Sequence, residues 1–314
     1  MDWMLLERCP LEIAKDDRER QPLAASRFPC CAYSGDVRDY IAGAMPAHWH
    51  REWELLLLES GAATVTLPNL EFVLQPGQGC FVNAEKLHRI ACAAAGPCRY
   101  RSLVFSPGIL SGEAGSVFDV RYIRPLLEHG PPALWLRREE RWQQPVFAGF
   151  EEAFSACARE PAGYEFAVRH ALSQAALCIR AHSAQSKAAR PDSLQEERLK
   201  QMIGWLDAHY EQPVTLRGLA GAVHLSAREC ERIFAQLLHS APMAYLLHRR
   251  VAAASALLAD TSLPVVEIGL RCGFSSHSYF SKQFRALTGY TPREYRGRVR
   301  EGTAPSAAQE KAEP

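Results

Sequence analysis

The pattern of apolar and polar positions divides the chain into a strand-rich first part and a helical second part. From about Val37 to Phe105, short apolar runs are separated by glycine, proline or asparagine, as in WELLLLES, GAATVTLP, LEFVLQPGQG, GCFVNA, HRIACAA and YRSLVF. Runs of this kind predict an antiparallel barrel or sandwich. Beyond residue 117 the apolar positions recur at helical spacing, and in the segment 164–183 one stripe holds Phe166, Ala167, His170, Ala171, Gln174 and Leu177.

An internal repeat lies in the helical part of the chain, after a polar, proline-containing segment at 184–195 that is expected to be a linker. Two similar stretches begin at Leu219 and Ile268, about fifty residues apart. The paired positions are Leu225 with Phe274, Ser226 with Ser275 and, after a one-residue insertion, Arg232 with Lys282 and Phe234 with Phe284. The repeat predicts one structural unit that is built twice.

Each copy has the layout of a helix-turn-helix unit, in which a short amphipathic helix and a turn precede a second helix opened by a serine N-cap. The apolar positions would bury the crossing of the two helices, so the polar positions of the second helix are free to face a partner. These side chains could reach base edges in a major groove. They are Ala227, Arg228, Glu231 and Arg232 in the first copy, and His277, Ser278, Ser281 and Lys282 in the second. The helix expected over 242–260 would hold the two reading helices about 34 Å apart, the distance between successive major grooves.

The charge of the chain is distributed unevenly, although the net charge is only +1. Residues 212–300 hold twelve Lys and Arg against five Asp and Glu, a local charge of +7, whereas residues 1–211 hold 23 against 27, a local charge of −4. A polyanionic partner would therefore prefer the second part. The alternative is a helical bundle whose basic residues only face solvent, and the repeat with its two capped turns argues against it.

The chain is expected to be cytoplasmic and to have no membrane partner. No apolar run approaches the roughly 18 uncharged residues that cross a bilayer. The first residues carry acids where a signal peptide would need a basic end and an apolar stretch. The ten cysteines form no CxxC pair, which argues against a zinc finger or a disulfide framework.

Residues 213–296 closely resemble the AraC/XylS transcription regulators, whose second helix-turn-helix carries the pattern GF-x-x-x-S-Y-F-x-x-x-F-x-x-x-x-G-x-x-P-x-x-Y-R. The matching residues are Gly273, Phe274, Ser278, Tyr279, Phe280, Phe284, Gly289, Pro292, Tyr295 and Arg296. The resemblance implies base contacts from Arg228, Glu231 and Arg232 in the first unit and from His277, Ser278, Ser281 and Lys282 in the second. It also implies phosphate contacts from Arg250 and Arg285, and double-stranded promoter DNA and RNA polymerase as partners of a transcription activator, with a repressor as the alternative.

Two positions depart from the family pattern. Ser240 stands where the family usually has the glycine that closes the first recognition helix. Glu231 is an acid on the recognition face. It could accept a hydrogen bond from a cytosine amine, or it could instead pair with a neighbouring arginine of its own helix.

The segment from Gly43 to Gly61 reads G-x4-HWH-x3-E-x6-G, and a further histidine, His88, follows. This arrangement resembles the two motifs of the cupin barrel, in which three histidines and a glutamate point inward and often bind a divalent metal. Alternation along a strand would place His48 and His50 on one face, with Glu54 at even spacing from His50. A set of three histidines and one carboxylate suits iron, manganese, nickel or zinc. Without a metal, the same groups would hydrogen-bond an organic ligand or one another.

We therefore expect an α+β multidomain protein with a cupin-like effector-sensing barrel at 1–116, a helical dimerisation region at 117–183, a linker at 184–195, an all-α double helix-turn-helix domain at 196–299 and a disordered tail at 300–314. A small-molecule effector is expected in the barrel, near His48, Trp49, His50, Glu54 and His88. A homodimer is expected, and the alternative is that helices 117–183 pack only against their own barrel. The competing functions are a metal-dependent cupin enzyme with a DNA-binding tail and a constitutive DNA-binding protein.

Overall fold

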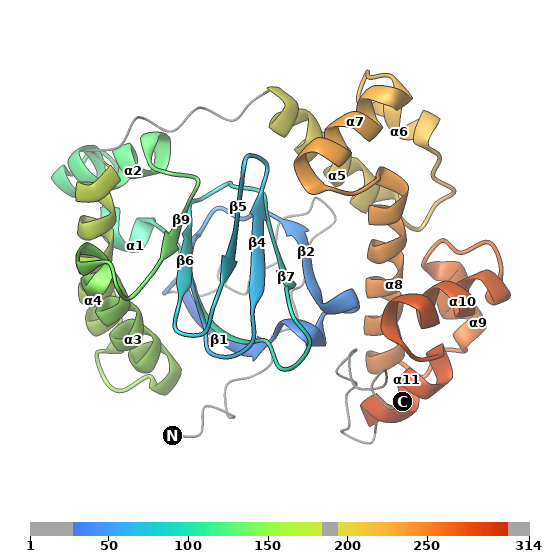
Figure 1. Ribbon diagram of the computed structural model, residues 1–314, viewed down its shortest axis with the longest axis horizontal. Helices are drawn as coiled ribbons and strands as arrows, with labels where there is room; N and C mark the ends of the chain where they lie inside the picture. Colours follow the sequence, from blue (N-terminus) through green and yellow to red (C-terminus); the bar gives the residue numbers. More distant parts are fainter. Residues whose placement is uncertain (1–27, 184–193, 301–314) are drawn as a thin grey trace.

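The computed structural model describes residues 28–183 and 194–300, and its strands form two sheets that face each other (Figure 1). We refer to the two sheets together as the barrel. The five-stranded sheet has the order β1 (Cys30–Asp36), β8 (Arg99–Phe105), β3 (Trp53–Leu58), β6 (Gly79–Val82) and β9 (Ala133–Leu136). The four-stranded sheet has the order β2 (Ala44–His48), β7 (His88–Cys92), β4 (Ala63–Leu67) and β5 (Leu70–Leu74). All strand pairs are antiparallel, as the sequence predicts.

Strand β3 shows how side chains alternate between the two faces of the larger sheet. Leu56 and Leu58 belong to the hydrophobic cluster between the sheets, whereas Trp53, Leu55 and Leu57 belong to a second cluster beneath the helices that cover the outer face. A strand that packs against apolar side chains on both faces has a nearly continuous run of apolar residues in its sequence. The run WELLLL therefore holds one inward polar position, Glu54, which is 6% exposed.

Helices between residues 108 and 183 cover the outer face of the five-stranded sheet, on the side of the barrel opposite the C-terminal helices (Figure 1). They are α1 (Gly108–Ser111), the π-helical turn η4 (Asp119–Ile123), α2 (Arg124–His129), α3 (Gln144–Arg159) and α4 (Tyr164–Ser183), with the short 3₁₀ turns η2 (Val37–Asp39), η3 (Ile41–Gly43) and η5 (Arg141–Gln143) elsewhere in the N-terminal part.

One expectation for this region needs correction. Strand β9 lies inside the segment expected to be helical, so the barrel takes a strand from beyond residue 116.

Helix α4 buries one of its faces, through Val168, Ala171, Leu172, Ala175, Ala176 and Ile179. Of the stripe noted in the sequence, Ala171 belongs to this buried face, whereas Phe166 and Leu177 are 79% and 44% exposed.

The C-terminal part is entirely helical in its described residues and consists of two helix-turn-helix units joined by one long helix. The first unit comprises α6 (Leu216–Ala222) and α7 (Ala227–Leu238), preceded by α5 (Leu194–His209). The long helix α8 (Pro242–Asp260) leads to the second unit, which comprises α9 (Val265–Arg271) and α10 (His277–Thr288), followed by α11 (Pro292–Arg300). Residues 184–193 of the expected linker and 301–314 of the expected tail lie outside the described residues. Helix α5 already includes the last two residues of the expected linker, 194 and 195, and residue 300, expected in the tail, still belongs to α11.

The two copies of the repeat align slightly differently from the sequence-based pairing. Ser226 caps α7 and Ser276 caps α10, so Ser226 corresponds to Ser276 and the inserted residue is Ser275. The pairing of Arg232 with Lys282 holds. The left-handed residue that closes α7 is His239, not Ser240, and its counterpart in the second unit is Gly289.

The first helix-turn-helix unit packs against the outer face of the four-stranded sheet. Ala47, Trp49 and Leu87 of the barrel share one hydrophobic cluster with the buried residues of α5 and α7. Two polar contacts accompany this cluster: Lys200 Nζ donates to Glu85 O over 2.7 Å, and Asn69 Nδ2 donates to Glu196 Oε1 over 2.6 Å. None of the helices in residues 28–183 and 194–300 is long and apolar enough to cross a bilayer.

Candidate functional site

Helices α7 and α10 each begin at a serine whose side chain fixes the first turn. Ser226 Oγ accepts a hydrogen bond from the backbone N–H of Glu229 over 3.1 Å, and Ser276 Oγ accepts one from that of Tyr279 over 3.2 Å. Each bond satisfies a donor that the helix leaves open at its N-terminus. The buried faces are anchored by large side chains, Phe234 in α7 and Phe280 with Phe284 in α10. The opposite face of each helix is therefore set in a fixed orientation.

The sequence-predicted reading residues lie on those opposite faces. Six of them are exposed and Ser281 is half-buried. They are Arg228, Glu231, Arg232, His277, Ser278, Ser281 and Lys282. The structure thus brings them together as two polar surfaces, one on each helix-turn-helix unit. Arg285, expected to contact phosphate, is also exposed on α10.

Arg232 is held by its own helix. Its guanidinium donates to both carboxylate oxygens of Glu229, over 2.8 and 2.9 Å, and to Gln236 Oε1 over 2.8 Å. The acid that pairs with this arginine is therefore Glu229 rather than Glu231, which lies exposed on the recognition face. The pairing holds the guanidinium extended along the helix surface.

Arg250 has a different role from the expected phosphate contact. Its Nε donates to Tyr210 O over 2.8 Å and its Nη2 to Gln212 O over 2.7 Å, so this half-buried side chain fastens α8 to the segment after α5. The turn of the second unit also packs closely against the segment after α5. A Cβ built on Gly273, in that turn, would lie only 2.3 Å from Tyr210 O. The guanidinium is thus engaged in joining the two units. The glycine of the GF pattern was the available sequence signal for this junction.

A buried ion pair adds to the junction and was not predicted from the sequence. Asp207 of α5 is fully buried, and its Oδ1 lies 3.2 Å from Arg249 Nε. The hydroxyl of Tyr245 donates to Asp207 Oδ2 over 3.2 Å. Burial raises the pKa of Asp207 to about 7, although the Arg249 charge and these hydrogen bonds act in the opposite direction. Both partners come from α8, so the pair fixes that helix against α5.

Inside the barrel, His48, His50, Glu54 and His88 form a buried group that we call the histidine cluster. One ligand atom from each residue lies within 4.8 Å of the others, and the four residues are between 1% and 6% exposed. His48 is paired in register with His88 across β2 and β7. His88 Nε2 lies 3.2 Å from Glu54 Oε2, and His50 Nε2 lies 3.6 Å from the same oxygen. The residues predicted from the HWH motif are therefore brought together.

Each histidine of the cluster is oriented by a backbone carbonyl. The Nδ1 atoms of His48, His50 and His88 donate to the carbonyls of residues 46, 52 and 86 over 2.8, 3.0 and 2.9 Å. A carbonyl can only accept, so each Nδ1 carries a proton, and Nε2 is left as the ring atom that would bind a metal once it carries no proton. Ser102 Oγ in turn donates to Glu54 Oε1 over 2.7 Å. Outer contacts of this kind are typical of metal-binding histidines and carboxylates, so the donor set fits a divalent transition metal.

The buried surroundings shift the ionisation of the cluster. Burial, followed by the neighbouring imidazoles of His88 and His50, lowers the pKa of His48 well below its usual range. Burial by itself would raise the pKa of Glu54, but hydrogen bonds from His50 and His88 hold it well below its usual range. A neutral imidazole beside an ionised carboxylate is the protonation state that metal ligands require.

Two family models match the chain and together span both parts of the structure. The AraC-like ligand-binding domain matches residues 35–153, and a helix-turn-helix domain matches residues 219–298. The chain belongs to the AraC/XylS-type transcription regulators. The resemblance identified from the GF-x-x-x-S-Y-F pattern is thereby confirmed.

Relatives of this AraC-type regulator extend over most of its length. It is 27% identical over 271 residues to the uncharacterized HTH-type transcriptional regulator YdeC of Bacillus subtilis, which covers 86% of this chain and 92% of YdeC. It is 26% identical over 260 residues to the HTH-type transcriptional activator RhaS of Pectobacterium atrosepticum, 81% of this chain and 88% of RhaS. A solved AraC-type DNA-binding protein from Chromobacterium violaceum is 38% identical, covers 33% of this chain and 93% of that one, and gives a TM-score of 0.32.

Trp49 of the AraC-type regulator was expected beside the effector, and the structure places it elsewhere. Its side chain is 8% exposed and belongs to the cluster shared with α5, outside the barrel. A residue between two inward histidines of an extended segment must face outward, so the alternation itself carried this information. Trp49 is therefore an interface residue.

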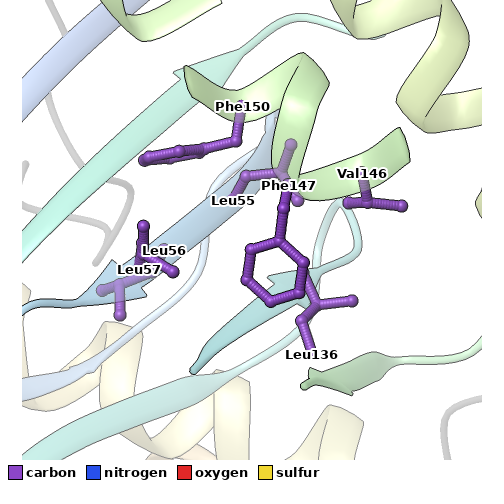
Figure 2. Close-up of a pocket in the computed structure, with 7 residues that line it drawn as sticks. All are labelled: Leu55, Leu56, Leu57, Leu136, Val146, Phe147 and Phe150. Atoms are coloured by element: carbon purple, nitrogen blue, oxygen red, sulfur yellow. The ribbon is translucent and has the colours of Figure 1, made fainter. Parts of the chain in front are cut away.

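Two hollows in the described residues of the AraC-type regulator lie outside the barrel interior. Figure 2 shows one between β3 and α3, where Phe147 and Phe150 lie near Leu55 and Leu57; its volume is about 10 Å³, which is room for about one water molecule. A larger hollow of about 510 Å³ lies between the two helix-turn-helix units, beside Tyr210 and Arg249. Between the sheets, large buried side chains such as Leu56, Phe72 and Ile90 pack together.

Proposed function

We propose that this regulator binds double-stranded promoter DNA with α7 and α10 in successive major grooves, and that an effector bound by the N-terminal domain alters this binding. The observation that carries the proposal is the pair of capped helices with exposed polar faces, which α8 and its buried contacts hold in one fixed arrangement. A single chain that presents two reading helices can recognise an asymmetric site. The local charge of +7 in residues 212–300 favours a polyanion at this surface.

The proposed contacts divide into those that read bases and those that position the backbone. In the first unit Arg228, Glu231 and Arg232 reach base edges, with Glu231 placed to accept from a cytosine amine. In the second unit the base-reading residues are His277, Ser278, Ser281 and Lys282. Arg285 contacts phosphate, whereas Arg250 is left out because its guanidinium is engaged at the junction.

Single substitutions test the assignment of the two reading helices. Arg232→Ala and Lys282→Ala are each expected to weaken binding to a selected site by about 1–3 kcal/mol, because each removes a base contact, and to leave thermal unfolding unchanged. The measurement is the dissociation constant on DNA fragments selected by the purified chain, at one fixed salt concentration. Arg121→Ala, an exposed cation of the N-terminal part, is the matched control. Unchanged DNA affinity in both test variants would contradict the assignment of α7 and α10 as the helices that read bases.

The N-terminal domain is proposed to bind a small-molecule effector at the histidine cluster, and the chain is proposed to act without enzymatic turnover. Support comes from the match to a ligand-binding domain over residues 35–153 and from the four convergent polar groups inside the barrel. By analogy with the activator RhaS, we propose activation of transcription in the cytoplasm through contact with RNA polymerase. The test is the expression of a reporter gene fused to the target promoter, measured with and without the chain. Expression that falls when the chain is present would show repression and contradict the proposed activation.

A homodimer is proposed to form through the exposed face of α4. Phe166, His170, Gln174 and Leu177 follow one another at helical spacing on this face. On neighbouring η4 and just before it, Val117, Phe118 and Val120 are 52%, 54% and 48% exposed. A second copy of the chain would cover both groups, because an apolar stripe of this kind matches its own symmetry mate.

Phe166→Asp is expected to raise the dissociation constant of the dimer at least roughly 30-fold, since a central aromatic anchor typically contributes about 2 kcal/mol or more. Sedimentation velocity over a concentration series measures the effect. Leu270→Asp is the control, because Leu270 is 59% exposed on α9, in the DNA-binding domain. A monomeric parent chain, or equal behaviour of the two variants, would rule out this face.

A further inference from the structure

The histidine cluster and the contact with the DNA-binding domain are built on the same two segments of chain. Along residues 47–50 the inward imidazoles alternate with Ala47 and Trp49, which pack outward in the cluster shared with α5. Leu87, the residue directly before the paired strand β7, packs in that shared cluster next to the inward His88. Adjacent residues of an extended segment face opposite sides, so a displacement of the inward side chains displaces the outward ones.

A hydrogen-bonded link runs beside this packing. The backbone N–H of Glu85 donates to His50 O over 2.7 Å, and Glu85 O accepts from Lys200 Nζ of α5 over 2.7 Å. Glu85 has a φ of 59°, a backbone conformation that residues other than glycine rarely adopt. The backbone of a cluster residue is therefore joined to the first helix of the DNA-binding domain through one intervening residue.

The size and chemistry of the cluster favour a single ion over an organic molecule. Three imidazole Nε2 atoms and one carboxylate converge in a space otherwise filled by large apolar side chains. Metal–nitrogen bonds of about 2.0–2.1 Å place the donors of a tetrahedral site roughly 3.3 Å apart. The cluster atoms lie within 4.8 Å of one another, so binding requires a small contraction of the loop and strands that carry them.

We propose that the effector is a divalent transition-metal ion held by the histidine cluster, and that its binding is transmitted to the first helix-turn-helix unit through Trp49, Leu87 and the Glu85–Lys200 contact. The inference rests on the proposed function, because it names the ligand and the route of the response proposed above. Contraction of the cluster tightens the segments 47–50 and 85–88. The outward side chains Ala47, Trp49 and Leu87 of these segments pack in the cluster shared with α5, so the ion changes how firmly the DNA-binding domain is held.

Metal binding is measured first, on the full chain stripped with a chelator and dialysed against Zn²⁺, Ni²⁺, Mn²⁺ or, without oxygen, Fe²⁺. Elemental analysis is expected to find about one ion per chain for at least one of these metals. The double variant His48→Ala, His88→Ala should lose it, whereas His129→Ala, which changes an exposed histidine, should keep it. Circular dichroism and thermal unfolding establish that the double variant is folded.

Transmission is measured by hydrogen exchange and by DNA affinity. Adding the bound metal is expected to slow amide exchange in residues 194–209 and to change the DNA dissociation constant at least about fivefold, the lower end of usual coupling. Trp49→Ala is expected to bind the ion with unchanged stoichiometry and to lose the DNA response. Lys200→Met tests the second route if Trp49→Ala does not fold, and it should reduce the response at unchanged stoichiometry.

The outcomes separate this inference from the proposed function. Absence of stoichiometric binding for all four metals overturns the inference, as does a bound metal that alters neither exchange in α5 nor DNA affinity. Specific DNA binding that is independent of metal would leave the regulator assignment standing. Loss of specific DNA binding with and without metal would instead contradict the proposed function itself.

Discussion

Replacing Arg232 and Lys282 together by alanine is expected to weaken specific DNA binding by about 2–6 kcal/mol, the sum of two losses of about 1–3 kcal/mol. The two side chains lie on different helix-turn-helix units and share no partner: Arg232 contacts Glu229 and Gln236 of its own helix. If each helix occupies its own groove, the two losses are independent and add. The measurement is a double-mutant cycle of dissociation constants on the selected site.

Binding to unrelated DNA is the control for this cycle. Loss of a base contact removes affinity for the selected site and leaves binding to unrelated DNA nearly unchanged, whereas loss of a phosphate contact weakens both. The double variant should therefore approach the affinity of the parent chain for unrelated DNA. A combined loss no larger than the single losses would mean that only one helix reads the site at a time.

Gly273→Ala is expected to lower the free energy of unfolding of the DNA-binding domain by about 2–5 kcal/mol. Gly273 has a φ of +79°, and an alanine in the left-handed region costs about 1–2 kcal/mol. The new Cβ would also lie 2.3 Å from Tyr210 O and 2.9 Å from Arg250 Nε, and relieving such contacts costs about 1–3 kcal/mol more. Arg250 would be displaced from the carbonyls that it joins. Urea unfolding measures the stability, and DNA affinity measures the effect on the two reading helices.

Gly289→Ala is the matched control for this substitution. Gly289 has a similar φ of +82°, but nothing lies within 4 Å of a Cβ built there. Its replacement is expected to cost only the backbone strain, about 1–2 kcal/mol, and to leave the junction between the units intact. Equal losses in the two variants would show that the close approach of Gly273 to Tyr210 contributes nothing.

The sequence predicted the recognition helices well because their signals are local. Serine caps, apolar spacing and the GF-x-x-x-S-Y-F pattern all act within one or two helical turns, and the HWH motif and Glu54 lie within seven residues. The one-residue error at Ser275 arose because two adjacent serines can both serve as an N-cap in sequence, and only the backbone decides between them.

Features that depend on distant contacts were not predictable in the same way. Trp49 and Arg250 were misassigned because the elements that contact them are far away in sequence. Strand β9 was read as part of a helical region, and its pairing with β6 bridges about fifty residues. Periodicity says that a face is apolar; it does not say which element covers that face.

The most direct test of two-helix recognition is hydroxyl-radical footprinting of a selected DNA site, under conditions in which one chain binds. Two protected stretches are expected on one face of the duplex, centred about one helical turn apart, with the second stretch weakened by Lys282→Ala. A single protected stretch, or two stretches on opposite faces of the duplex, would contradict two-helix recognition.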